Sequence, residues 1–307
     1  MLVSCSLVIG STGFIGKSLC KSLDEEHTYT VSRKKSSNTY KSSHFLIDIR
    51  NDEKVEKILK KLYKKYEHIN IFFLAGESSV ESSLSNPEKS FFYSLKSFIT
   101  IISKLKKNKT TIIIASSGAI YDSRKKKCFD EKDSLYPPSS YAASKFAIEG
   151  LALAHHESFG IDIRVARIFS VFGEDMERFF IFDLIKKLKS SKKKITLRGS
   201  GNQERDYLHV KDVVQGLILI LKKGKAGEIY NICSGKPIKL KNLAERVKKI
   251  LNKQNIKIAW NKEKSPGIRE SWYGKNNKIK KMGFKIKNFD ESLSKSVLEI
   301  NSKLKRK

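Results

Sequence analysis

Residues 10–16, with the sequence GSTGFIG, constrain the fold of this chain more strongly than any other segment. Their glycines recur at every third position, after an apolar run and before a segment with helical periodicity. Glycine is needed where a backbone turns sharply or approaches a phosphate, and a helix N-terminus offers free N–H groups to an anion. This order predicts a dinucleotide-binding strand, turn and helix. The residues expected to contact the dinucleotide are Gly10, Thr12, Gly13, Phe14, Ile15 and Gly16.

Short apolar runs alternate with amphipathic helical segments through the first half of the chain. The expected strands cover residues 5–10, 28–33, 44–48, 69–76, 110–117 and 161–169. The expected helices between them cover residues 16–26, 51–66, 86–107 and 140–160. This alternation is typical of right-handed βαβ crossovers. It predicts an α/β fold with a Rossmann-type, doubly wound parallel sheet in residues 1–170.

The second half is less regular. A lysine-rich helical segment, a short strand at residues 194–199 and another strand at residues 228–235 follow without strict alternation. We expect residues 171–307 to form a smaller, mixed α/β region that binds the substrate. Segments near residues 205–235 are expected to return to the first domain.

The end of the second expected strand bears on the choice of dinucleotide. An acid there binds the ribose 2′-hydroxyl of NAD, whereas a nearby arginine accommodates the 2′-phosphate of NADP. Ser32 and Arg33 stand at this point, so NADP is slightly favoured over NAD, although these residues could equally form an ordinary solvated loop. Asp48 and Ile49 follow the third strand and are expected to face the adenine ring. Ala75, at the end of the fourth strand, is expected to contact the cofactor.

A tyrosine precedes a lysine by four residues at three places: Tyr121/Lys125, Tyr141/Lys145 and Tyr207/Lys211. In a lysine-rich chain this spacing alone is close to chance. Tyr141 differs because the strand before it ends in Ser117, at the carboxyl edge where open α/β sheets bind ligands. Tyr141 and Lys145 also begin an apolar helix, so both project from one face of its first turn. We expect Ser117, Tyr141 and Lys145 to form a catalytic group.

Together these motifs resemble the extended short-chain dehydrogenase/reductases of the nucleotide-sugar epimerase/dehydratase family. The matching segments are GSTGFIG, the strand-end serine in SSGAIY, YAASK, RIFSVFG at residues 167–173 and RDYLHVKDV at residues 205–213. The resemblance implies hydride transfer, usually at C4 of a nucleoside-diphosphate sugar, with NAD or NADP. A 4-epimerase and a 4-ketoreductase both fit, in surface-polysaccharide or deoxysugar biosynthesis.

The resemblance also implies catalytic roles. Tyr141 acts as the general acid/base, Lys145 lowers its pKa and holds the nicotinamide ribose, and Ser117 orients the sugar oxygen. The pKa of an unperturbed tyrosine is about 10, so a base near neutral pH requires a decrease of roughly 3 units. A neighbouring ammonium and the positive nicotinamide ring act in that direction.

The substrate contacts follow from the same resemblance. Arg205 matches the family arginine that binds the diphosphate, and the alternative is a structural ion pair with Asp206 or Asp212. His209 is expected to pack or to cap a helix.

The chain departs from the family pattern at two substrate positions. Ser170 stands where the family commonly has an asparagine, and Ser265 stands where an arginine before proline is usual. Lys264 or Arg269 is expected to replace that arginine.

A 4,6-dehydratase and an inactive binding protein are the two other functions to consider. Dehydratases of the family carry an acidic pair after the strand-end hydroxyl, where this chain has Gly118 and Ala119, so a 4,6-dehydratase is disfavoured. The net charge of +30 keeps an inactive relative that binds RNA or senses the cofactor as an alternative. Lysine-biased composition explains the charge more simply, because the lysines are spread over several helices.

The remaining expectations concern the environment and assembly of the protein. The four cysteines form no C-x-x-C pair, which indicates reduced thiols, no metal site and a cytoplasmic location. No apolar run approaches the roughly 18 residues of a membrane span. By resemblance, a homodimer is expected through residues 91–102 and 146–154.

Overall fold

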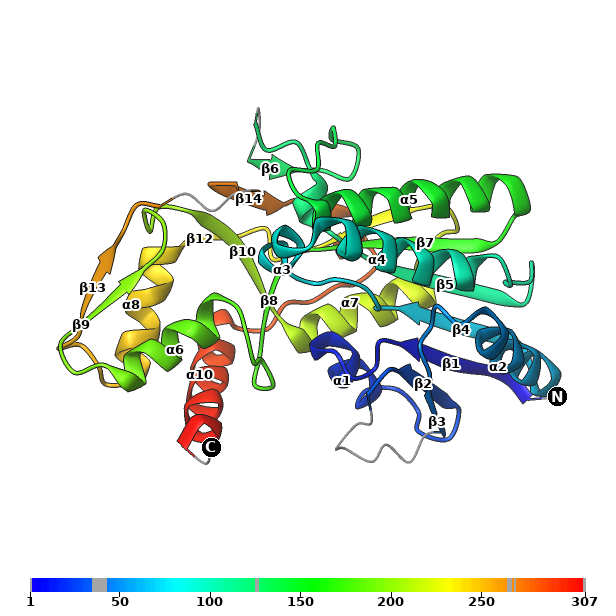
Figure 1. Cartoon of the computed structure of the whole chain (residues 1–307), viewed down its shortest axis with the longest axis horizontal. Helices are drawn as coiled ribbons and strands as arrows, with labels where there is room; N and C mark the ends of the chain where they lie inside the picture. The colour runs from blue at the N-terminus through cyan, green and yellow to red at the C-terminus, as the bar shows by residue number, and fades with distance from the viewer. Residues whose placement is uncertain (1, 35–42, 125–126, 264–266, 268, 306–307) are drawn as a thin grey trace.

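The structure is a computed structural model that describes residues 2–34, 43–124, 127–263, 267 and 269–305 (Figure 1). Its main feature is a seven-stranded sheet with the order β3-β2-β1-β4-β5-β7-β11. All adjacent strands in this sheet are parallel. The strands are β1 (Leu2–Ile9), β2 (Thr28–Ser32), β3 (Ser43–Leu46), β4 (Tyr66–Phe73), β5 (Thr110–Ser117), β7 (Asp162–Ile168) and β11 (Ile229–Ile232). The predicted Rossmann-type sheet is therefore confirmed.

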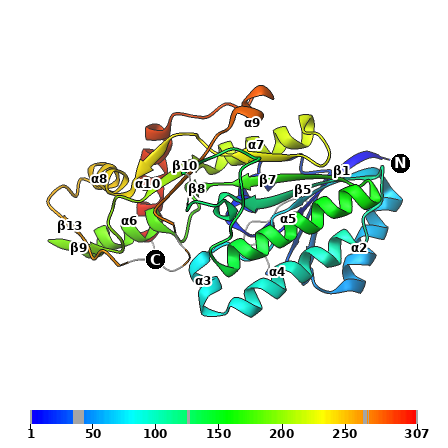
Figure 2. The ribbon, with the colours of Figure 1, turned by 90° about the horizontal axis from the view of Figure 1, so that it is seen from above.

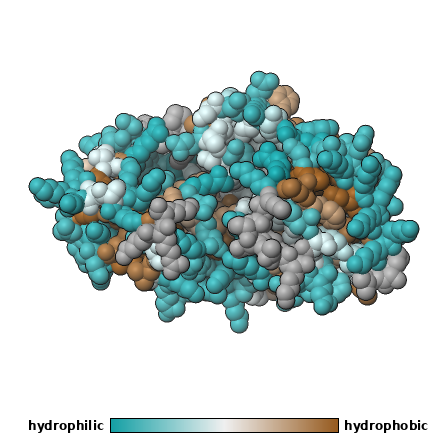
Figure 3. Space-filling view, turned by 60° about the horizontal axis from the view of Figure 1, so that its bottom comes forward, coloured by the Kyte–Doolittle hydropathy of each residue, from teal (hydrophilic) through white to brown (hydrophobic). Residues whose placement is uncertain are grey.

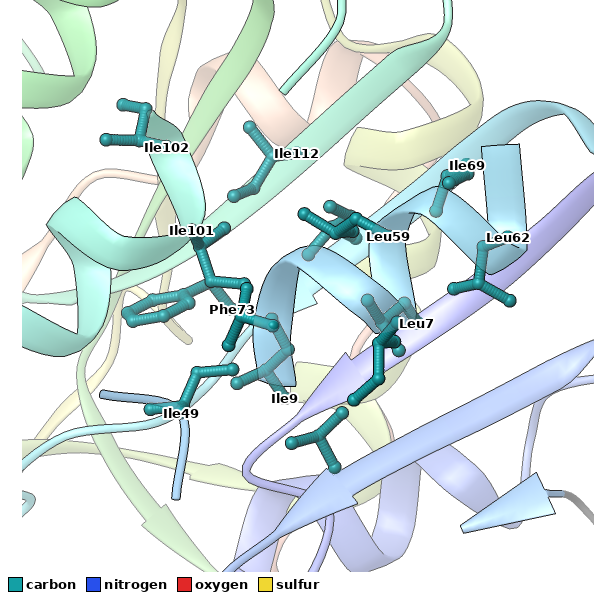
Figure 4. Packing of buried hydrophobic residues seen from close by; sticks show 14 of the residues in the cluster. Leu7, Ile9, Ile49, Leu59, Leu62, Ile69, Phe73, Ile101, Ile102 and Ile112 are labelled. Atoms are coloured by element: carbon teal, nitrogen blue, oxygen red, sulfur yellow. The ribbon is translucent and has the colours of Figure 1, made fainter. Parts of the chain in front are cut away.

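Helices cover both faces of this sheet, as Figure 2 shows from above. One face packs against α2 (Asp52–Lys65), α4 (Pro87–Ile102) and α5 (Ser140–Phe159), and the other against α1 (Phe14–Cys20) and α7 (Val210–Lys223). Side chains alternate between the faces of a strand. Leu7 and Ile9 accordingly join the first hydrophobic cluster (Figure 4). Val8, between them, joins the second cluster on the other face.

Polar side chains fix where the helices of the first face begin. Asn51 accepts a hydrogen bond from the backbone N–H of Lys54 and caps α2. Asn86 caps α4, which has proline at its first position, and Ser139 caps α5. Such side chains satisfy N–H groups that have no partner within the helix. A short helix, α3 (Val80–Ser85), precedes α4 and was not expected from the sequence.

The second part of the molecule has its own sheets and its own hydrophobic cluster. β8 (Ser170–Phe172), β10 (Glu204–His209), β12 (Pro237–Lys239), β14 (Ser271–Gly274) and β6 (Cys128–Phe129) form a mixed sheet. β9 (Lys194–Leu197) pairs with β13 (Lys257–Trp260). The cluster joins β8, β9, β10, β12 and β13 to α6 (Phe180–Ser190), α8 (Leu240–Ile250) and α10 (Phe289–Lys305), whereas β6 and β14 contribute to a separate small cluster. Another short helix, α9 (Asn277–Lys281), packs near β11. The division at residue 170 stays a prediction.

Two whole-chain features complete the description. No helix in the described ranges is long and apolar enough to cross a bilayer. The four cysteines are free thiols, and burial raises the pKa of Cys5 and of Cys20 to about 12. Thiols with such pKa values remain protonated, and hence poorly reactive, near neutral pH.

Candidate active site

The glycine turn closes against the strand beside it. Gly10 has a φ of +90°, and a Cβ there would lie 2.9 Å from the backbone nitrogen of Ala75. A Cβ on Gly16 would lie only 2.2 Å from the carbonyl oxygen of Gly10. Gly13 is exposed and is the N-cap residue of α1, where it offers no side-chain cap. The first-turn N–H groups of α1 therefore have no capping side chain, and this glycine cradle fits a pyrophosphate.

The other residues of the turn serve packing. Phe14 packs against the hydrophobic cluster of the second part of the molecule, whereas Ile15 packs against the cluster between α1, α7 and the sheet. Thr12 is half-buried in the turn. Their backbone N–H groups, more than their side chains, are thus suited to meet phosphate.

The residues expected at the adenosine end lie in different surroundings. Ser32 is buried and its hydroxyl lies 3.3 Å from His44 Nε2, whereas Arg33 is exposed. Asp48 forms an ion pair with Arg50 at 2.6 Å. Hydrogen bonding from Arg50 lowers the pKa of Asp48 to about 2, and the charge of Arg33 acts in the same direction. The expected contacts of Arg33 and Asp48 with a dinucleotide stay predictions.

Ile49 does not present its side chain at the surface. It packs with Ile9, Phe73 and Ile101 in the first hydrophobic cluster (Figure 4). Only 8% of the residue is exposed, which leaves little surface for a ligand. The expected contact of Ile49 with adenine stays a prediction.

The structure brings the three expected catalytic residues together. Ser117 ends β5, and its hydroxyl accepts a hydrogen bond from the backbone N–H of Ala119 at 3.1 Å and lies close enough to the Tyr141 phenol to act on its pKa. Tyr141 lies in the first turn of α5, which Ser139 caps. Lys145 lies one turn later, and its Nζ donates to the carbonyl oxygen of Ala115 in β5 at 3.0 Å. A strand end and a helix start thus hold the hydroxyl, the phenol and the ammonium in one site.

The pKa of Tyr141 differs from the expectation. Burial raises it above the usual value of 10, and the charge of Glu77 adds to the increase. Hydrogen bonding from Ser117 and the charge of Arg178 only oppose this rise. The predicted decrease caused by Lys145 is therefore wrong for the protein alone, because the ammonium is directed to a strand carbonyl.

Burial acts on Lys145 in the opposite sense. It lowers the pKa of this ammonium to about 8, whereas the charges of Glu149 and Glu77 raise it. Lys145 is consequently a weakened cation that can lose its proton in mildly alkaline solution.

Two charged residues near this group were missed in the sequence. Glu77 follows β4, and its carboxylate accepts hydrogen bonds from the backbone N–H groups of Ser78 and Ser79. Arg178 comes from the second part of the chain, and its guanidinium donates to the Ser78 hydroxyl. The position of Glu77 after a parallel strand was a usable signal. The position of Arg178 in the sequence gave no such signal, because Arg178 is distant from Ser117, Tyr141 and Lys145 along the chain.

The other two tyrosines of the repeated spacing are structural. Tyr121 is fully buried, donates to Asn231 Oδ1 at 2.7 Å, and is paired in sequence with Lys125, which lies outside the described residues. Tyr207 is buried against Phe172 in the second part, and burial raises its pKa to about 12. Both phenols are thus held by packing or hydrogen bonds within the fold.

Arg205 holds backbone carbonyls. Its guanidinium donates to the carbonyl oxygens of Glu204 at 2.7 Å, Glu270 at 2.8 Å and Arg269 at 2.8 Å. It also lies over the Trp272 ring at 3.8 Å. Burial lowers its pKa to about 10. The expected contact with a diphosphate stays a prediction, but one role is clear, because Arg205 fixes the segment that enters β14.

The alternative ion pairs of Arg205 are not formed. Asp206 accepts hydrogen bonds from backbone N–H groups, including that of Ser234 at 2.6 Å, and Asp212 accepts from that of Lys287. His209 caps α7 by accepting from a backbone N–H, as expected.

The remaining substrate candidates lie at separate points. Ser170 begins β8, directly after β7 and opposite Tyr207 of β10. Arg269 lines a small pocket together with Gly118 and Ala119, next to Ser117. Lys264 and Ser265 lie outside the described residues.

Comparison with known proteins agrees with this architecture. The model of the NAD dependent epimerase/dehydratase family matches residues 6–233. A UDP-glucuronate 4-epimerase from Thermodesulfobacterium geofontis is 28% identical over 287 residues, which cover 83% of this chain and 86% of that protein. A UDP-N-acetylglucosamine 4-epimerase from Methanobrevibacter ruminantium M1, solved with UDP-N-acetylmuramic acid, has a TM-score of 0.84 at 25% identity, with coverage of 99% and 100%.

The same fold occurs in a dehydratase. The dTDP-glucose 4,6-dehydratase DesIV from Streptomyces venezuelae, solved with NAD, has a TM-score of 0.86 at 20% identity, with 97% of each chain covered. The doubly wound parallel sheet of this chain, with its glycine turn after β1, defines a Rossmann-type fold of the dinucleotide-binding class. Ser117, Tyr141 and Lys145 lie at the carboxyl edge of that sheet. Within that class, the chain belongs to the NAD dependent epimerase/dehydratase family.

Proposed function

We propose that the protein catalyses NAD(P)-dependent oxidation and reduction at C4 of a nucleoside-diphosphate sugar, as a 4-epimerase or a 4-ketoreductase. The observation that supports this proposal is the grouping of Ser117, at the end of β5, with Tyr141 and Lys145 in the first turns of α5, where Lys145 donates to the Ala115 carbonyl oxygen. The glycine cradle at the end of β1 supports binding of a dinucleotide at the same edge of the sheet. Surface-polysaccharide or deoxysugar biosynthesis is the setting that fits such a reaction.

Each catalytic residue has a distinct task in this proposal. Tyr141 accepts the proton of the C4 hydroxyl and later returns it, and Ser117 hydrogen bonds the same oxygen. Lys145 meets the nicotinamide ribose, while its ammonium stays bonded to the carbonyl oxygen of Ala115. Bound NAD or NADP supplies hydride transfer and, when oxidised, a positive charge that opposes the effect of burial on the Tyr141 pKa. Arg205 and Arg269 are the candidates for the diphosphate and the sugar.

The two enzymatic alternatives differ in how they use the cofactor. A 4-epimerase oxidises C4, lets the ketone turn over and returns the hydride, so the cofactor stays bound. A 4-ketoreductase consumes NADPH stoichiometrically. Arg33 favours the reductase slightly, whereas the similarity to a UDP-glucuronate 4-epimerase favours the epimerase.

One incubation tests the proposal. Purified protein is mixed with UDP-linked or dTDP-linked hexoses, with and without added NADPH, and the sugars are analysed by nuclear magnetic resonance. Turnover without added cofactor supports the epimerase, and strict dependence on NADPH supports the reductase. Tyr141→Phe should abolish either reaction, and unchanged activity in that variant would contradict the proposed mechanism.

Two other functions fit less well. A 4,6-dehydratase needs an acid after the strand-end hydroxyl, but Gly118 and Ala119 occupy those positions, so no 4-keto-6-deoxy product is expected. The charge of +30 keeps an inactive relative that binds RNA or senses the cofactor as an alternative, but such a relative has no need for Ser117, Tyr141 and Lys145 together. Such binding would weaken steeply with salt and would persist in Tyr141→Phe.

A homodimer is part of the proposal. α4 and α5 pack side by side, and Phe92 and Phe146 expose 58% and 43% of their surface on them. Large exposed aromatic side chains on adjacent helices are suited to burial against a second copy. Light scattering of the wild type and of the Phe92→Glu variant tests this assignment.

A further inference from the structure

The positive charge of the chain is distributed unevenly between its two parts. Residues 171–307 contain 35 lysines and arginines against 14 aspartates and glutamates, whereas residues 1–170 contain 27 against 18. Residues 184–203 include seven of these basic residues and residues 246–262 include six, and neither range contains an acid. Segments of this kind create a positive potential that attracts anions.

The fold brings the two acid-free ranges side by side. β9 and β13 pair in parallel, and Lys194 lies directly opposite Lys257. Lys194 is exposed, whereas Ile195 packs into the hydrophobic cluster on the other side of the strand. Adjacent strands lie about 5 Å apart, and like charges directly opposite each other destabilise a sheet. The two lysines therefore do not serve the stability of the strand pair.

Further lysines extend this surface. Lys187 of α6 donates to the carbonyl oxygen of Thr196 in β9 at 2.7 Å, which holds it beside the strand. We give the name basic patch to five exposed lysines: Lys187, Lys192, Lys193, Lys194 and Lys257. No acidic side chain of the described residues forms an ion pair with any of them, and the nearby Glu263 pairs with Arg198. β9 and β13 lie at the end of the molecule away from the seven-stranded sheet (Figure 1).

The side chains around the basic patch indicate the kind of anion that it fits. Neither acid-free range has a large exposed hydrophobic side chain, and Trp260 is stacked on Phe180. Single-stranded nucleic acids are bound through exposed aromatic rings, and arginine is preferred at nucleic-acid phosphates. Here 11 of the 13 basic residues in the two ranges are lysines. Clustered lysines are compact, hydrated charges that are attracted to a layer of anionic headgroups.

We propose that the basic patch docks the protein on an anionic lipid surface. The contact is peripheral and electrostatic, because the two ranges offer no exposed apolar side chain for insertion between lipids. Each lysine held near such a surface increases the affinity about fivefold. Salt screens this attraction, so the protein leaves the surface as ionic strength increases. The docking is independent of the reaction proposed above, because the patch contains none of the catalytic residues.

Cosedimentation with vesicles tests this inference. One set of vesicles contains phosphatidylglycerol mixed with phosphatidylcholine, and the other contains phosphatidylcholine alone. The wild type should bind the first set and not the second, and sodium chloride should release it. Replacing three patch lysines together, Lys193→Gln, Lys194→Gln and Lys257→Gln, should weaken binding on the order of 100-fold. Circular dichroism should show that this variant remains folded, since the lysines are exposed.

A matched control removes the same charge from another surface. It combines Lys57→Gln, Lys61→Gln and Lys64→Gln on α2, where all three lysines are exposed. This variant should bind the phosphatidylglycerol vesicles nearly as well as the wild type. Equal losses in the two triple variants would overturn the inference, because total charge and not the patch would then cause binding. It would also be overturned if the wild type bound neither set of vesicles, or if it bound duplex RNA more tightly than phosphatidylglycerol vesicles in the same salt.

Discussion

At the scale of single residues, the glycine turn is set by steric exclusion. Gly16 faces the carbonyl oxygen of Gly10 so closely that a Cβ would lie 2.2 Å from it. The contact is backbone to backbone, so neither side can give way by rotating a side chain. The turn thus depends on the absence of one carbon atom.

Gly16→Ala should abolish cofactor binding. The added methyl group must push α1 away from the end of β1, which displaces the N–H groups proposed to meet pyrophosphate. Titration with NADH and NADPH, followed by fluorescence, measures the loss. Gly150→Ala is the matched control, because a Cβ at that helical position meets nothing within 4 Å. It should preserve binding and stabilise α5 by roughly 0.5–1 kcal/mol. Unchanged affinity in Gly16→Ala would contradict the cradle.

Lys145 makes stability depend on pH. Its pKa is about 8 in the folded protein and 10.5 ordinarily, so the unfolded chain binds more protons between these values. Stability from this group therefore increases as pH rises from about 8 to 10.5, by about 3 kcal/mol in total. Urea unfolding of the wild type and Lys145→Met across this range measures the effect. The difference between them should grow with pH in favour of the wild type, and a constant difference would refute the assignment.

Local sequence predicted some of these residues and missed others for a physical reason. The glycines, Ser117, Tyr141 and Lys145 follow directly from strand and helix ends. The pKa of Tyr141 does not, because it depends on burial, and the partners of Arg205 do not, because they come from residues 269 and 270. Contacts between distant segments leave no pattern in the local sequence.

At the scale of elements, α5 is anchored beneath the site by a buried ion pair. Arg167 of β7 binds Glu149 of α5 at 2.8 Å, and neither side chain exposes more than 3% of its surface. Arg167 also donates to the Tyr121 hydroxyl at 2.9 Å. The helix that carries Tyr141 and Lys145 is thereby joined to the sheet.

Arg167→Met should destabilise the protein by about 3–5 kcal/mol, because it leaves the Glu149 carboxylate buried without a partner. Adding Glu149→Leu to that variant should restore most of the lost stability, since the unpaired charge is gone. Free energies of unfolding in urea measure both effects. If the double variant is as unstable as Arg167→Met alone, the buried charge is not the cause.

The long elements were predictable and the short ones were not. Strong periodicity marked α2 and α4, and β5 was recognisable as a continuous apolar run. β6 contains only Cys128–Phe129 and gains its place by pairing with β14, more than a hundred residues later. A strand this short is defined by its pairing with a distant strand, so its local sequence contains no periodicity that predicts it.

At the scale of the whole molecule, charge is the main imbalance. The chain carries a net charge of +30, and the face in Figure 3 is largely hydrophilic. Like charges on a compact molecule repel each other, and salt screens them over a distance of about 10 Å at 0.1 M.

The thermal midpoint should therefore rise by a few degrees as sodium chloride increases from low to moderate concentration. Differential scanning fluorimetry without other ligands measures it. Potassium chloride should give the same curve, because screening depends on ionic strength and not on the cation. A midpoint that falls with salt would mean that attractive ion pairs outweigh the repulsion.

The packing of Phe14 couples the thermal unfolding of the two parts of the molecule. This residue begins α1 at the glycine turn, yet its ring belongs to the packing of the second part of the chain. Neither portion can loosen without exposing a phenyl group that the other one shelters. A calorimetric scan should accordingly contain one endotherm, and coenzyme should move that entire peak to higher temperature without splitting off a shoulder.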